Sequence, residues 1–147
     1  MFFKDGQCYQ GYFSDNEIKG EGIRKWKDGR IYYGKWDKNK MNGYGLFYWP
    51  DKKKYYGHYY DGIKDGFGIF LWSDGKIYEG LWKEGKQNGY GIINKNNEKK
   101  YGIWEKGNLI KYIDNLEEIS TVNKCIEGFK EDNAYTEFMN KKDKYDG

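Results

Sequence analysis

Large apolar residues and glycines alternate with polar residues along most of this chain. Segments 66–72 (Gly-Phe-Gly-Ile-Phe-Leu-Trp) and 78–82 (Tyr-Glu-Gly-Leu-Trp) show the period of two that is typical of a β-strand. Asp-Gly pairs at 28–29, 61–62 and 74–75 stand between such segments, and they favour hairpin turns because glycine adopts positive φ at little cost. The pattern therefore predicts an antiparallel meander of short strands with no helices between them.

The alternation is periodic. Glycines recur every 23 residues and once after 22, each followed two residues later by an aromatic residue. This structural repeat consists of Gly11 and Phe13, Gly34 and Trp36, Gly57 and Tyr59, Gly80 and Trp82, and Gly102 and Trp104. A second set of Gly-x-Gly pairs, such as Gly66 and Gly68, keeps the same spacing. Since residues two apart share a strand face, we expect one face to hold a ring ladder, in which a ring from the adjacent strand covers each glycine.

The predicted fold class is all-β: an elongated single-layer antiparallel β-hairpin repeat array with a short helical C-terminal tail. In an array of this kind each repeat is buried by its neighbours. The predicted array spans 1–110, with a half repeat at 1–8, repeats at 9–31, 32–54, 55–77 and 78–100, and a partial repeat at 101–110. The remaining segment, 111–147, is an acidic and partly helical capping or docking tail.

The tail carries two helical patterns. Ile110, Ile113, Leu116 and Ile119 have three-residue spacing, which favours a short amphipathic helix over 109–119. A second helix is expected over 134–139, with Asp132 or Asn133 as its N-cap. We expect the tail to cap the exposed last strand, with docking on a separate partner or a second copy as the alternative.

Composition changes this picture little. Aromatic residues make up 20% of the chain, so it is not a disordered sequence, and the net charge of +3 is small. The repeats between 9 and 100 carry a net +6 and residues 101–147 a net −3. The longest apolar run, 67–72, is far too short for a membrane span, and the two cysteines fit reduced thiols in the cytoplasm.

Catalytic and metal chemistry is not expected. Cys8, Cys125 and His58 cannot assemble an ordinary zinc site. Gly80 to Lys86 fits most of a phosphate-binding loop, but Gln87 stands where Ser or Thr should hold magnesium. The rings recur where glycines need cover, so a nucleic-acid platform is not expected either. We therefore expect no enzyme activity, no cofactor, no metal and no nucleic acid.

The unit Tyr78-x-Gly80-x-Trp82-Lys-x-Gly85-Lys86-x-x-Gly89-x-Gly91 resembles the MORN repeat (membrane occupation and recognition nexus), and the likeness extends in one register over residues 3 to about 107. The resemblance implies a single-layer twisted sheet and a scaffold or adaptor role in cytoskeletal, ciliary or membrane-cortex assemblies. Some members bind a partner peptide and some form dimers. This chain departs from the pattern at Asn16 and Asn39, which replace the turn glycine, and at 51–52, where Asp-Lys replaces Asp-Gly. Asparagine tolerates the left-handed region, so the turns should survive.

The face opposite the ring ladder is the predicted partner-binding surface. A single sheet has nothing of its own to cover that face, and a contiguous apolar surface usually marks an interaction site. We call these residues the apolar strip: Tyr44, Leu46, Tyr48, Phe67, Ile69, Leu71, Tyr90 and Ile92. A partner helix or extended peptide is one expected occupant, and a second copy is a further partner. The protein's own tail is an equally good occupant of the strip.

Anionic lipid is the alternative ligand. Lysines near a charged membrane contribute about 1 kcal/mol each when several face it together. The second repeat concentrates the candidates: Lys35, Lys38, Lys40, Lys52, Lys53 and Lys54. In this alternative the protein is a membrane-surface adaptor.

Overall fold

The computed structural model describes residues 8–14 and 17–142. Most of the half repeat predicted at 1–8, and Asn16, lie outside the described residues. The described strands form one ten-stranded sheet in which each strand pairs antiparallel with its neighbours in chain order. The strands are β1 (Cys8–Ser14), β2 (Glu17–Lys25), β3 (Ile31–Asp37), β4 (Lys40–Tyr48), β5 (Lys54–Tyr60), β6 (Ile63–Leu71), β7 (Ile77–Lys83), β8 (Lys86–Lys95), β9 (Glu98–Glu105) and β10 (Asn108–Ile113).

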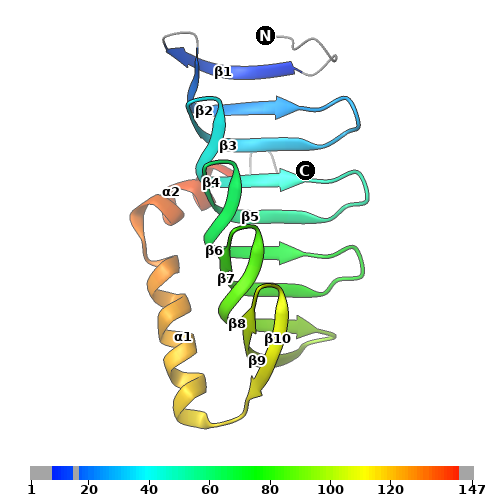
Figure 1. The fold of residues 1–147 in the computed structure, drawn as a ribbon, viewed down its shortest axis with the longest axis vertical. Coiled ribbons are helices and arrows are strands. Elements are labelled where there is room, and N and C mark those ends of the chain that lie inside the picture. Colours follow the sequence, from blue (N-terminus) through cyan, green and yellow to red (C-terminus); the bar gives the residue numbers. More distant parts are fainter. Residues whose placement is uncertain (1–7, 15–16, 143–147) are drawn as a thin grey trace.

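Two helices follow the sheet, α1 (Leu116–Lys130) and α2 (Asn133–Lys142). Figure 1 shows the strands stacked along the long axis of the molecule and both helices lying across one face of the sheet. The predicted all-β repeat array with a helical C-terminal tail is therefore confirmed.

The face opposite the two helices carries the ring ladder as the first of two apolar cores. Tyr32, Tyr55 and Tyr78 are fully buried in it. Each of these rings meets an aromatic ring of its own repeat and one of the next repeat edge-on. Tyr55, for example, lies 5.3 Å from Tyr59 and 5.4 Å from Trp82 between ring centroids. The ladder consists of Tyr32, Trp36, Phe47, Tyr55, Tyr59, Phe70, Tyr78, Trp82 and Trp104.

Each buried tyrosine covers two glycines. A Cβ added to Gly68 would lie 2.3 Å from the Tyr55 hydroxyl, and one added to Gly57 would lie 2.7 Å from the same atom. Gly57 and Gly68 face each other across β5 and β6. The expectation that glycines serve as sockets for rings is confirmed. The expected source of the ring needs correction, since Tyr55 covers a glycine of its own strand as well as one of the adjacent strand.

A bulge beside each of these glycines provides a hydrogen-bond acceptor for the tyrosine hydroxyl. The register of β5 with β6 shifts between Gly57 and Tyr59 and leaves His58 without a partner on that side. The Tyr55 hydroxyl donates a hydrogen bond to the His58 carbonyl at 2.9 Å. Tyr32 and Tyr78 donate in the same way to the carbonyls of Lys35 and Leu81, at 3.0 and 2.8 Å. The rings therefore fill the sockets without leaving a buried polar group unpaired.

The turns follow the sequence expectation. Asn39 adopts a φ of 67° and Lys52 a φ of 76°, both in the left-handed region. Asp28, Asp51 and Asp74 each accept a hydrogen bond from the backbone N–H two residues on. This bond is the largest cause of the lowered pKa of each of these carboxyls.

The helix predicted over 109–119 is wrong for the residues before Leu116. Residues 108–113 form strand β10, and α1 begins only at Leu116. Pairing with β9 fixes the strand, because Tyr112 faces Gly102 and Ile113 faces Tyr101. The side chain of Asn115 then accepts hydrogen bonds from two backbone N–H groups and caps the helix.

The second predicted helix is confirmed as α2, which extends beyond 134–139 to Asn133–Lys142. The Asp132 carboxylate accepts hydrogen bonds from the backbone N–H groups of Ala134 and Tyr135, at 2.9 and 3.2 Å. Asp132, one of the two residues predicted for this role, is therefore the N-cap of α2.

Candidate functional site

Strand alternation places the apolar strip on the face opposite the ring ladder. Leu46 and Phe67 are fully buried there, with 0% and 1% exposure, and Tyr44, Ile69 and Ile92 are also buried. Tyr48 and Leu71 are partly buried and pack against the same cluster. Tyr90 alone of the strip remains exposed, at 38%.

The tail helices cover the strip and form the second core with it. The ring of Phe129 in α1 stacks on Phe67 at 5.3 Å between centroids, with an angle of 5° between the planes. The ring of Tyr135 in α2 meets Tyr44 edge-on at 5.6 Å, and Phe138 stacks on Tyr44 at 6.1 Å. The sequence left open whether a partner, a second copy or the tail covers the apolar strip, and in the structure the tail covers it. The expectation that the tail caps the last strand is wrong, because among the described residues β10 pairs only with β9 and Figure 1 shows α1 running along the face of the sheet.

Two ion pairs hold the helices at the margins of this core. The Lys130 ammonium lies 3.0 Å from a carboxylate oxygen of Glu79, and the Lys141 ammonium lies 2.9 Å from Glu21. Hydrogen bonds to Glu21 and then to Glu137 raise the pKa of Lys141. Each pair is partly exposed, so solvent screening keeps its contribution to stability small. The apolar contacts therefore provide most of the attachment.

A model of the MORN repeat matches four consecutive segments of the chain, residues 9–29, 32–54, 55–77 and 78–94. The chain belongs to the MORN repeat family. A comparison with curated proteins finds no match. MORN repeats generally mediate protein or membrane interactions, and the family is generally non-catalytic.

The matched segments of the MORN array end before β9, so the tail helices lie outside the family pattern. Sequence reasoning missed the tail's side of the apolar core, although a signal was present. Ile119, Val122, Ile126 and Phe129 recur at intervals of three and four residues, as one face of a helix requires. Reasoning from the repeat also missed residues on β5, β7 and β9, the first strands of their repeats, that pack in this core: Tyr56, Ile77, Tyr101 and Ile103.

The candidate lipid-binding lysines do not gather on one surface of the MORN array. Lys35, Lys38 and Lys40 lie on β3, in the β3–β4 turn and at the start of β4, and Lys52, Lys53 and Lys54 lie in the β4–β5 turn and at the start of β5. Lys54 pairs with Tyr48, at the far end of β4 from Lys40, so roughly 27 Å separates Lys40 from Lys54 at 3.4 Å per residue. Two of them already have carboxylate partners, Lys40 with Asp61 at 3.3 Å and Lys53 with Asp51 at 3.2 Å. The six are Lys35, Lys38, Lys40, Lys52, Lys53 and Lys54.

Two titratable side chains elsewhere in the array, His58 and Lys64, contact aromatic rings of the sheet. The His58 ring nitrogen Nδ1 lies 3.0 Å from the Asp65 carbonyl, and its ring meets Tyr44 edge-on. The Lys64 ammonium lies within 5.8 Å of four aromatic ring centroids, including Tyr55 and Trp82, and burial lowers its pKa. Within residues 8–14 and 17–142, no three His, Cys, Asp or Glu side chains gather as metal ligands would.

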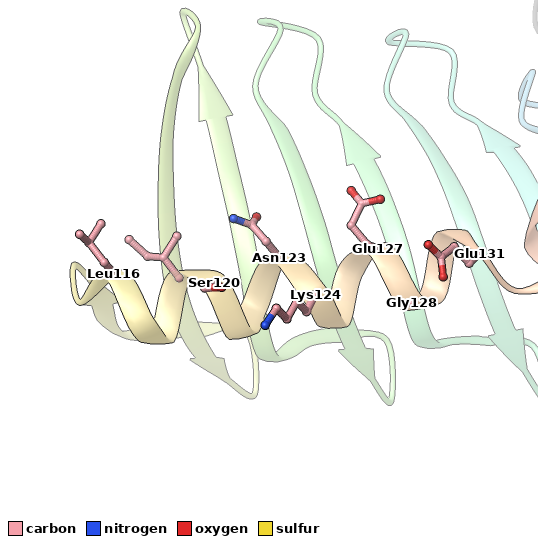
Figure 2. A pocket seen from close by; sticks show the side chains of 8 residues that line it. Leu116, Ser120, Asn123, Lys124, Glu127, Gly128 and Glu131 are labelled. Carbon is pink, nitrogen blue, oxygen red and sulfur yellow. The ribbon is translucent and has the colours of Figure 1, made fainter.

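The outer surface of α1 is hollowed but polar. A pocket of about 480 Å³ runs along this helix, and the residues that line it come from α1 and its C-cap, Glu131. Figure 2 shows Asn123 and Glu127 projecting on one side of the helix and Lys124 on the other. The Asn123 side chain also accepts a hydrogen bond from the Tyr101 hydroxyl at 3.0 Å, which ties α1 to the sheet. In the described part of the chain, neither helix is long and apolar enough to cross a membrane.

Proposed function

We propose that this MORN protein is a non-catalytic scaffold that binds an amphipathic helix of a partner protein on the apolar strip, in place of its own tail. Its setting would be a cytoplasmic assembly at the cytoskeleton, the cilium or the membrane cortex. One observation carries the proposal: the strip already holds two amphipathic helices, α1 and α2, through aromatic and aliphatic contacts. A surface that packs helices of this kind has the shape and chemistry to receive another.

The tail is suited to exchange. Residues 114 and 115 form a short link between β10 and α1, so the sheet would keep its strand pairing if the helices left. The ladder on the opposite face is a separate cluster, built from other residues. Removal of the tail would therefore expose the strip without opening the core that holds the repeats together.

The tail also indicates what the partner helix should look like. It needs apolar residues at intervals of three and four to meet the strip, with aromatic rings where Phe129 and Tyr135 contact Phe67. It needs basic residues at its margins, because Glu79 and Glu21 accept Lys130 and Lys141 there. A peptide of residues 114–142 has these properties and can stand in for the partner.

The test is the binding of this peptide, fluorescently labelled, to the full chain and to a variant with a displaced tail. The variant Val122→Asp places a carboxylate in a fully buried position of the tail, which should detach α1 from the sheet. We expect the peptide to bind this variant at least about tenfold more tightly than the unsubstituted chain, because the vacant strip no longer requires displacement of a tethered helix. Fluorescence anisotropy gives both affinities.

The matched control is Ser120→Asp, which adds the same charge at an exposed position of the same helix. It should bind the peptide as weakly as the unsubstituted chain. Equal peptide affinity for all three proteins, or none for any, with the sheet intact by circular dichroism, would contradict the proposed exchange of the tail for a partner helix. Flotation of the full chain with anionic vesicles at physiological salt would instead favour the membrane-surface alternative.

A further inference from the structure

Lys64 places a charged group among the rings of the ladder. It faces the ladder residue Tyr59 across β5 and β6. Its ammonium lies between 5.5 and 5.8 Å from the centroids of four aromatic rings. We call these rings, which come from β5, β6, β7 and the turn after β4, the aromatic cage: Trp49, Tyr55, Phe70 and Trp82.

The aromatic cage offers the ammonium no hydrogen-bond acceptor. Among the described residues, no carboxylate or other acceptor contacts Nζ of Lys64. Burial, and then the like charge of Lys53, lower the pKa of Lys64. A primary ammonium has three N–H donors and is strongly hydrated, so a site built from rings alone suits it poorly. A methylated ammonium keeps the charge with fewer donors, and cations of this kind are the ligands that aromatic cages bind.

The neighbouring repeats do without a charge at this position. Met41, 23 residues before Lys64, faces Trp36, and Gln87, 23 residues after it, faces Trp82. Met41 is partly buried and packs against the ladder. Since an uncharged side chain serves in the repeats on both sides, the architecture of the repeat does not account for Lys64.

We propose that Lys64 is a lysine methylation site and that the aromatic cage holds its methylated ammonium. A separate methyltransferase would supply the methyl group from a sulfonium donor. Lys64 first releases a proton, and the lone pair of Nζ then attacks the methyl carbon. A carbon–nitrogen bond forms and the carbon–sulfur bond breaks, so the donor leaves as a thioether and the amine becomes a methylammonium of unchanged charge.

The amine is open to an enzyme. Within residues 8–14 and 17–142, no side-chain nitrogen or oxygen is both fully buried and without a partner, so Nζ of Lys64 keeps some contact with solvent. The tail helices lie across the opposite face of the sheet (Figure 1) and do not block it. The proposal concerns the ladder face only and does not rest on the function of the apolar strip.

The first test is tandem mass spectrometry of the full chain purified from its own cells. We expect Lys64 to carry the added mass of one to three methyl groups. Lys40 is the matched control, since its side chain is 56% exposed and pairs with Asp61 at 3.3 Å, and it should be unmodified. An unmodified Lys64, or equal methylation of Lys64 and Lys40, overturns the proposal.

The second test measures the fit of the aromatic cage to methyl groups. Lys64→Cys is made with Cys8→Ser and Cys125→Ser, and its thiol is alkylated in denaturant with a bromoethyl reagent that carries either an ammonium or a trimethylammonium group. After refolding, the two proteins have lysine analogues of equal charge that differ only in the methyl groups. We expect the thermal midpoint to be a few degrees higher for the trimethylated analogue, because rings bind this cation without hydrogen bonds.

The same pair of analogues at Lys40→Cys, in the same background, should show equal midpoints. Equal midpoints at position 64 as well, or a lower midpoint for the trimethylated analogue there, would contradict the proposal. The mass-spectrometric test involves no substitution, so it decides the proposal if the analogues at position 64 fail to refold.

Discussion

At the scale of single residues, the two glycines of each Gly-x-Gly pair have different reasons to be glycine. The first, as in Gly66, adopts a positive φ of 96°, which glycine alone reaches without strain. The second, as in Gly68, leaves room for the Tyr55 ring. The sequence shows both glycines with equal clarity, but their separate roles depend on the bulge, which strand alternation alone does not reveal.

Substitution at a socket should be costly. In Gly68→Ala the new methyl group would lie 2.3 Å from the Tyr55 hydroxyl and 2.4 Å from its ring, so the buried ring must move. We expect the free energy of unfolding to fall by about 1–3 kcal/mol, measured by chemical denaturation. The control is Gly128→Ala in α1, where the added carbon meets nothing within 4 Å, and where alanine should add about 0.5–1 kcal/mol. Equal stability of the two variants would contradict the socket model.

At the scale of elements, the strands and the ring ladder were predictable and the tail was only partly so. Strands such as 63–71 combine alternation with turn signals at both ends, and the period of 23 residues repeats that information several times. Ile110 and Ile113 lack this support. Their spacing fits a helix, but pairing with β9 decides in favour of a strand, and that pairing is a long-range contact that a local pattern does not contain.

The apolar strip was predictable for a different reason. Phe67 and Ile69 lie on the opposite side of β6 from the ladder residue Phe70 by simple alternation. What covers the strip was not predictable, because either a partner or the tail could bury the same residues. Val122 and Ile126 of α1 reach the sheet only because the turn at 114–115 and the N-cap at Asn115 set the direction of the helix.

The ring ladder should control stability at alkaline pH. Burial raises the pKa of Tyr32, Tyr55, Tyr59 and Tyr78 above the ordinary value of 10.0. Since these groups stay protonated in the fold but ionise near pH 10 when unfolded, their contribution is fully present below pH 10 and is lost as the pH rises through the raised pKa values. We therefore expect a tyrosinate absorbance step above pH 10 that coincides with loss of the sheet signal in circular dichroism. Reversible ionisation of all tyrosines with the sheet intact would contradict this burial.

At the scale of the whole molecule, one sheet separates two apolar layers with different tasks. The ladder fixes the repeats to one another, with Trp and Tyr rings from neighbouring repeats in edge-on contact. The opposite layer joins the sheet to the tail helices, with Phe129 on Phe67 near its centre. The ladder therefore supports the repeats, and in the proposed function the tail-covered face is the part whose occupant changes. Among the described residues β10 pairs with β9 alone, which leaves its outer edge as a third surface that neither layer uses.

The central claim is that the tail occupies the apolar strip, and nuclear Overhauser effects in the full-length protein test it most directly. We expect cross-peaks between the ring protons of Phe67 and Phe129, whose centroids lie 5.3 Å apart, and between those of Tyr44 and Tyr135, at 5.6 Å. Cross-peaks between adjacent strands serve as the internal reference for an intact sheet. If the strand cross-peaks are present while none connects residues 116–142 to the sheet, the tail does not occupy the strip and the proposed exchange has no basis.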